Sequence, residues 1–66
     1  MLPKVMGKRI QKARKKIGWT QEELASKVGI SAIYMGFIEQ GRNAASVPVL
    51  SKIARLLKIK LSDLFD

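Results

Sequence analysis

Helix stop and start signals alternate along this chain, and they constrain its fold more than any other feature. Glycines suited to the left-handed backbone conformation that ends a helix are each followed by a serine or threonine suited to cap the next one. The glycines are Gly18, Gly29 and Gly41, and the caps that follow them are Thr20, Ser31 and Ser46. Apolar residues recur with a helical period between these signals. The sequence therefore predicts an all-α fold of short helices in a single domain, residues 1–66.

The first predicted helix begins near Pro3, a residue that suits the first turn. Its apolar stripe consists of Met6, Ile10, Ala13 and Ile17. Such spacing is typical of an amphipathic helix that packs one face on a core.

The second predicted helix begins at Gln21 and has two agreeing start signals. Thr20 and Glu23 have the spacing of a capping box, in which each side chain binds a free backbone N–H of the first turn. Trp19 and Leu24 have the spacing of a hydrophobic staple across the same turn.

Three further helices are predicted after it. Ser31 and Gly41 bound the third, and the fourth follows Ser46, with Pro48 tolerated in its first turn. A short fifth helix ends the chain with the apolar residues Leu61, Leu64 and Phe65.

The second and third helices match a helix-turn-helix motif over about residues 20–41. Ala25 supplies the small residue that a steep helix crossing needs, and Gly29 supplies a positive φ in the turn. The expected buried positions of the motif are Leu24, Val28, Ile30, Met35 and Ile38. A plain helical hairpin would need only some of these residue types, so the match favours the motif.

The charge balance indicates a polyanionic partner. The chain has 13 Lys and Arg against 5 Asp and Glu, a formal net charge of +8, and seven of the basic residues lie between Lys4 and Lys16. Such a domain attracts nucleic acid, an anionic membrane or an acidic protein. Lysines that only increase solubility are the alternative.

Composition argues against several other classes of protein. With no Cys and no His, disulfides are excluded, and we expect no zinc or haem site and no cofactor. No carboxylates are paired for acid–base work, because Glu22 and Glu23 are sequential and point to different faces, so we expect no enzymatic activity. Neither a secretion signal nor an apolar run of about 18 residues is present, and we expect a cytoplasmic, nucleoid-associated protein.

Four segments resemble the phage-repressor and Cro-type helix-turn-helix family, over about residues 6–65. They are TQEELASKVGIS, IEQG, LSKIARLLKI and LSDLF. The resemblance implies a compact five-helix repressor-like domain of a bacterial or phage transcription regulator, whose helix 32–40 enters the major groove of a palindromic operator. It implies double-stranded DNA and a second copy as partners, with RNA polymerase or another protein as further candidates. Lys60 stands where the family has a capping serine, so Ser62 is expected to cap the fifth helix.

The resemblance also implies roles for individual residues. The implied phosphate contacts are Gln21, Tyr34, Arg42 and Asn43, with Lys8 and Arg9 adding positive charge. The implied base-reading surface is Ser31, Ala32, Ile33, Gly36 and Phe37. Arg14 and Glu39 resemble a buried ion pair, because Arg14 flanks the apolar stripe of its helix, where a charge requires a partner. The candidate dimer surface is Leu61, Leu64 and Phe65.

The base-reading positions differ from the family in being largely apolar. Family members place Arg, Lys, Gln, Asn or Ser at several of these positions. An apolar face can read DNA through thymine methyl groups. Alternatively, Ile33 and Phe37 form a patch for a protein partner, as in an antitoxin on the same scaffold. A membrane-active basic peptide is disfavoured, because the first helix alone would suffice for that role.

Overall fold

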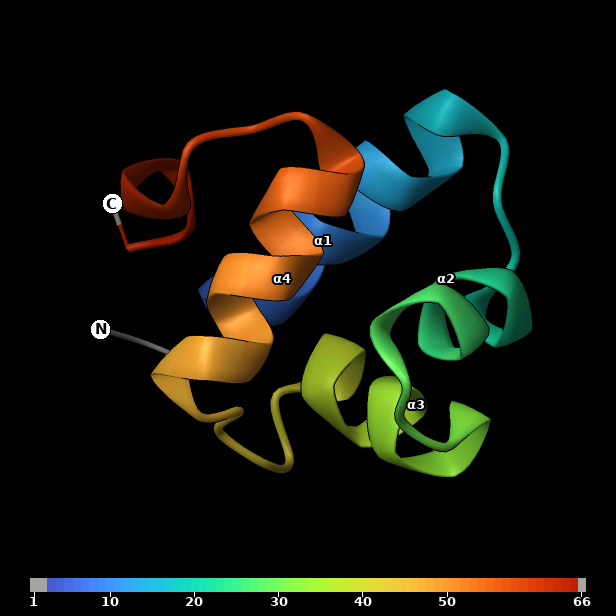
Figure 1. Ribbon diagram of the computed structural model, residues 1–66. Helices are drawn as coiled ribbons and strands as arrows, with labels where there is room; N and C mark the ends of the chain where they lie inside the picture. Colours follow the sequence, from blue (N-terminus) through green and yellow to red (C-terminus); the bar gives the residue numbers. More distant parts are fainter. Residues whose placement is uncertain (1–2, 66) are drawn as a thin grey trace.

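The computed structural model describes residues 3–65, and the fold is all-α over that range. Its α-helices are α1 (Pro3–Ile17), α2 (Gln21–Val28), α3 (Ala32–Gln40) and α4 (Val47–Leu57), followed by the 3-10 turn η1 (Leu61–Leu64) (Figure 1). The prediction of five helices is therefore right for four, and the fifth is a single tight turn. No helix in the described part of the chain is long and apolar enough to cross a membrane.

The capping box at the start of α2 is confirmed. The Thr20 hydroxyl accepts a hydrogen bond from the Glu23 N–H at 3.0 Å, and the Glu23 carboxylate accepts one from the Thr20 N–H at 3.0 Å. The hydrogen bond from the Thr20 backbone, and then that from its side chain, lowers the pKa of Glu23 below its ordinary value. The support that this carboxylate gives α2 is therefore present at neutral pH and is lost as the pH falls through that lowered pKa.

The boundaries of α3 and the start of α4 also follow the predicted signals. Ser31 Oγ accepts from the Tyr34 N–H at 3.0 Å, and Ser46 Oγ accepts from the Val49 N–H at 3.4 Å. Gly41 ends α3 in the left-handed conformation, with φ 75°. The local sequence therefore determines where these helices begin and end.

The C-terminal segment differs from expectation in its capping. Lys60 donates its backbone N–H to Asp63 Oδ2 at 3.1 Å, and Ser62 lies inside η1. The expectation that Ser62 caps this turn is wrong, because the Asp63 side chain already binds the free N–H at its start. Lys58 ends α4 with φ 58°, a left-handed conformation that glycine would adopt at lower cost.

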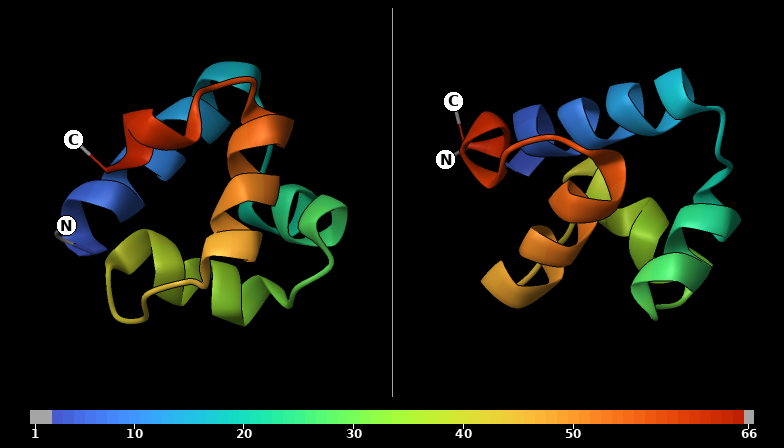
Figure 2. Two further views of the ribbon diagram at one scale, coloured as in Figure 1. Left: turned by 60° about the vertical axis from the view of Figure 1, so that its left-hand side comes forward. Right: turned by 45° about the horizontal axis from the view of Figure 1, so that its top comes forward.

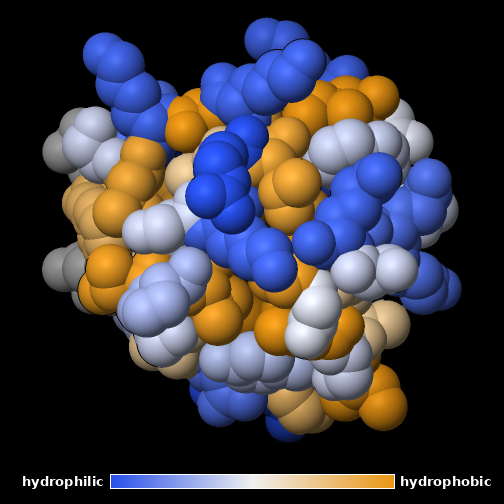
Figure 3. Space-filling model, in the orientation of Figure 1, coloured by the Kyte–Doolittle hydropathy of each residue, from blue (hydrophilic) through white to orange (hydrophobic). Residues whose placement is uncertain are grey.

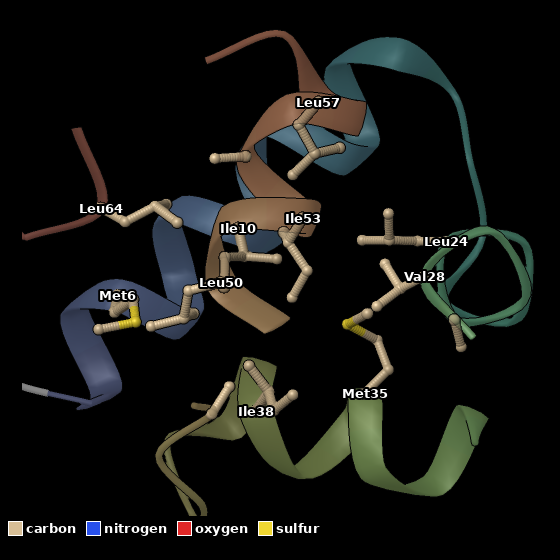
Figure 4. Packing of buried hydrophobic residues seen from close by; sticks show 13 residues of the cluster. Met6, Ile10, Leu24, Val28, Met35, Ile38, Leu50, Ile53, Leu57 and Leu64 are labelled. Carbon is tan, nitrogen blue, oxygen red and sulfur yellow. The ribbon is translucent and has the colours of Figure 1, made fainter. Parts of the chain in front are cut away.

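The core is shared by all five elements (Figure 4). Each element contributes at least one fully buried large side chain: Ile10, Leu24, Met35, Leu50, Ile53 and Leu64. Met35 and Ile38 point from α3 toward the other helices, which leaves the opposite side of α3 free of the core.

The predicted stripe of α1 is wrong at its last position. Ile17 is 41% exposed, because α1 ends there and Gly18, at φ 97°, turns the chain away. The helix instead buries Gly7 and Arg14 toward α3. The views in Figure 2 show α1 running past both α3 and α4, so it needs a second buried face.

Gly7 permits the close crossing of α1 and α3. A Cβ at this position would lie 2.5 Å from the backbone oxygen of Ile38 and closer still to that of Glu39. Since these are backbone atoms of the last turn of α3, they cannot move aside as a flexible side chain would. The absence of a side chain at Gly7 therefore sets how α3 lies against α1.

Gly7→Ala is expected to lower the free energy of unfolding by about 1–3 kcal/mol through overpacking, although alanine is about 1 kcal/mol better than glycine in a helix. Gly36 in α3 is the matched control. A Cβ there would meet only Gln21 Oε1, at an ordinary 3.5 Å, so Gly36→Ala should stabilise by up to about 1 kcal/mol. Urea unfolding of both variants measures these changes. If both substitutions changed the free energy of unfolding by the same amount in the same direction, the close crossing at Gly7 would be contradicted.

Candidate nucleic-acid interface

The outward side of α3 is apolar and partly exposed. Ile33 is 72% exposed, and Ala32 and Phe37 are half-buried, whereas Gly36 is buried. In the orientation of Figure 3, apolar atoms emerge at the lower edge of the molecule, over α3, and hydrophilic and apolar side chains are intermixed on the face above. Of the residues predicted to read bases, Ala32, Ile33 and Phe37 therefore lie on this outward side, and their contact with bases stays a prediction.

A shallow depression of about 310 Å³ lies between this face and the start of α2. It is lined by Gln21, Glu22, Ala32, Ile33, Gly36, Phe37 and Gln40. Gln40 and Glu22 are not among the residues predicted from the sequence for this surface. Gln40 could have been found from its spacing, because it stands four residues after Gly36 and seven after Ile33 on one helical face.

Ser31, a predicted base-reading residue, and Tyr34, a predicted phosphate contact, lie at the start of α3. The Ser31 hydroxyl oxygen is used as the helix cap, although its O–H remains able to donate. Tyr34 is half-buried and packs against the core. Its partial burial leaves only part of the Tyr34 side chain available for the predicted phosphate contact.

Behind this surface, a buried polar network ties α3 to α1. Arg14 Nε donates to Glu39 Oε2 at 2.7 Å and Arg14 Nη2 donates to Glu39 Oε1 at 3.0 Å. Both residues are buried, with 6% and 5% exposed. The hydrogen bond to Glu39 raises the pKa of Arg14 above its ordinary value, so the guanidinium stays charged despite its burial. The ion pair expected from the sequence is present, with two-point geometry.

Two further groups complete the network and bring in the start of α2. Arg14 Nη1 donates to the Trp19 backbone oxygen at 2.7 Å, and Gln21 Nε2 donates to Glu39 Oε1 at 3.0 Å. An amide nitrogen carries two N–H groups, so Gln21 keeps one for a ligand at the surface. The network orients this side chain without using all of its donors.

The basic residues predicted as phosphate contacts do not all lie together. Arg42 and Asn43 are exposed just after α3, and the Arg42 guanidinium lies 5.1 Å from the centroid of the Phe37 ring. Lys8 is exposed on α1, one residue after the crossing at Gly7.

Arg9 is separated from this group. It lies about 200° around α1 from Gly7 at 100° per residue, and its Nη1 donates to the Asp63 backbone oxygen at 3.1 Å. Arg9 therefore points to the η1 side of α1, away from α3. Its predicted phosphate contact stays a prediction, and it would lie apart from the contacts around α3.

The candidate dimer surface is also smaller than predicted. Leu64 is only 1% exposed and packs in the core, whereas Phe65 is 38% exposed and Leu61 is half-buried. Leu64 is therefore excluded from such a surface, because η1 turns it inward against α1 and α4.

Known proteins share both the sequence pattern and the fold. A family model described as helix-turn-helix matches residues 10–64. An HTH-type transcriptional regulator of Archaeoglobus fulgidus is 43% identical over 60 residues, which cover 91% of this chain and 86% of that protein. The restriction-modification controller protein C.AhdI from Aeromonas hydrophila has a TM-score of 0.88 at 32% identity, covering 94% of both chains. SinR of Bacillus subtilis, solved in complex with DNA, has a TM-score of 0.86 at 32% identity, covering 92% of this chain and 98% of that one.

Glu39→Ala is expected to lower the free energy of unfolding by about 3–5 kcal/mol, because it leaves the Arg14 guanidinium buried without its counter-charge. Replacing both partners, as Arg14→Met with Glu39→Leu, should restore most of this loss, since an apolar pair of similar volume removes the buried charge altogether. Denaturant unfolding of the single and double variants measures the coupling. A loss below about 1 kcal/mol for Glu39→Ala is the behaviour of an exposed pair and would refute this role.

Proposed function

The chain belongs to the helix-turn-helix family of Cro- and C1-type phage repressors, which are DNA-binding transcriptional regulators, and we propose that it inserts α3 into the major groove of a palindromic operator. The observation that carries this proposal is the exposed outer face of α3. Ile33 is 72% exposed at the start of that helix, where the recognition helix of this motif contacts base edges. A regulator of this kind works where the chromosome lies, in the cytoplasm of a bacterial or phage-infected cell.

Phosphate contacts on either side of α3 would position the helix. Gln21 at the start of α2 has a free amide N–H held in place by the Glu39 hydrogen bond. The backbone N–H groups of that helix start add a partial positive charge. Arg42 and Asn43 follow α3, and Tyr34 and Lys8 complete the proposed set on its flanks.

Arg42 has a defined conformation in this proposal because its guanidinium stacks on Phe37. Stacking of this kind contributes about 0.5–1 kcal/mol at exposed sites. This contact is thus proposed to hold the Arg42 guanidinium where it binds a phosphate.

We further propose that the protein binds its operator as a homodimer, with Phe65 and the exposed part of Leu61 at the interface. A two-fold dimer would place two α3 helices about 34 Å apart, one turn of B-DNA, and so match a palindrome. The small apolar area available on these residues favours pairing that is weak in the absence of DNA.

A protein-binding role is the second candidate, and the same apolar face of α3 favours it. An antitoxin-like module, or a regulator that contacts RNA polymerase, would cover Ile33 and Phe37 with a protein surface. Salt separates the two functions. For binding dominated by phosphates, the logarithm of the binding constant falls with the logarithm of the salt concentration, with a slope of about −0.9 for each phosphate contacted. Binding through burial of an apolar patch depends little on salt.

Enrichment of bound fragments from random duplexes tests the proposed function. We expect a two-fold symmetric motif with half-sites about one helical turn apart. Enrichment without any motif, together with salt-insensitive binding to a protein, would instead support the second candidate.

The enriched duplex then allows a test of the phosphate role. Arg42→Ala should weaken binding to all sequences alike and reduce the salt slope by about 1. Arg55→Ala is the matched control, because Arg55 is equally exposed but lies in the last turn of α4, which packs against α1, α2 and η1. An effect of Arg42→Ala confined to one operator position would contradict a phosphate contact.

A further inference from the structure

We propose that α3 identifies its operator by the 5-methyl groups of pyrimidines, those of thymine and equally of 5-methylcytosine. This inference rests on the proposed function and specifies the DNA chemistry that the same surface selects. Its three supports are the absence of polar groups at the centre of the surface, the shape of that centre, and the charges around it.

The central side chains of the surface cannot form hydrogen bonds to bases. Ala32, Ile33, Gly36 and Phe37 carry neither a donor nor an acceptor, and they occupy the first two turns of α3. The major-groove edges of base pairs differ in hydrogen-bonding groups and in the thymine methyl group. An apolar surface can distinguish only the last of these. Contact with any other edge would leave base donors and acceptors desolvated and unpaired.

The shape of the surface suits a methyl group. Ile33 and Phe37 are four residues apart, so their Cβ atoms lie about 6 Å from each other on one face. Gly36 lies between them in the chain, and the nearest atom to its missing Cβ is Gln21 Oε1, at 3.5 Å. Gly36 is buried and forms part of the lining of the shallow depression, together with Ile33 and Phe37, and Gln21 and Gln40 also line it. A methyl group resting there contacts carbon on more than one side.

The surrounding charges agree with a base edge as the occupant. The Arg42 guanidinium lies over the Phe37 ring, and Lys8 and Asn43 are exposed. These residues would bind the anionic phosphates outside the apolar centre. Glu22 is the acidic residue that lines the depression. Its carboxylate accepts hydrogen bonds only, as do the N7 and O6 groups of guanine, so it disfavours guanine at the adjacent position.

Replacing thymine by uracil in the enriched duplex tests this inference, because the exchange removes the methyl group and keeps every hydrogen-bonding group of the base. At the contacted positions we expect binding to weaken about fourfold per methyl group lost, the factor for one methyl-sized apolar contact. Placing 5-methylcytosine, paired with guanine, at the same positions should bind more tightly than unmethylated cytosine by a similar factor.

Protein variants assign the effect to α3. Ile33→Ala should bind the thymine and uracil duplexes nearly alike at the position that Ile33 reads, without loss of stability, because this side chain is mostly exposed. The matched control is Ile17→Ala, which removes a 41% exposed isoleucine from the end of α1 and should keep the full thymine preference.

The outcomes separate this inference from the function on which it rests. Sequence-specific binding that is equal for thymine and uracil duplexes would overturn methyl recognition and leave operator binding intact. A thymine preference that survives in Ile33→Ala and Phe37→Ala would likewise overturn it. Failure to enrich any duplex sequence would overturn the proposed function itself.

Discussion

The buried pairing of Arg14 with Glu39 is the interaction on which the rest of the structure depends. Its two hydrogen bonds, with those to the Trp19 carbonyl and from the Gln21 amide, join α1, the start of α2 and α3 in one network. A buried charge that loses its partner is costly, so each helix can occupy only the position that satisfies the others. Gly7 adds a steric condition, because the backbone of α1 at this glycine packs directly against the backbone of α3 and leaves no space for a side chain.

Because the residues on the inner side of α3 hold the helix in place, the residues exposed on its outer side are not needed for packing and are available to bind a ligand. Met35 and Ile38 anchor the helix in the core, and Ile33 stands in solvent. An isoleucine that is 72% exposed buries little surface on folding, and its position on the recognition helix leads us to propose a role in binding. We therefore propose that the cationic side chains around α3 supply affinity for DNA of any sequence. The apolar centre of the surface would supply selectivity for particular bases.

Local signals made most of the fold predictable. The hydroxyl caps and left-handed glycines act within one helical turn, so the bounds of α2 and α3 could be read from the sequence. Properties that depend on distant packing could not. Nothing local shows that Gly7 meets the carbonyls of α3, or that η1 turns Leu64 inward and brings Asp63 to Arg9. Family resemblance indicated the base-reading face, whereas the depression beside it emerged only from the arrangement of α2 beside α3.

The central claim is that the apolar outer face of α3 is the part of the protein that meets DNA bases. Isoleucine methyl labelling tests it most directly, through intermolecular nuclear Overhauser effects with the enriched duplex. We predict effects between the Ile33 methyl groups and major-groove base protons, thymine methyls included. We predict none for Ile17 at the end of α1 or for Ile59, which lies between α4 and η1. Effects at Ile17 or Ile59 and none at Ile33 would contradict the account.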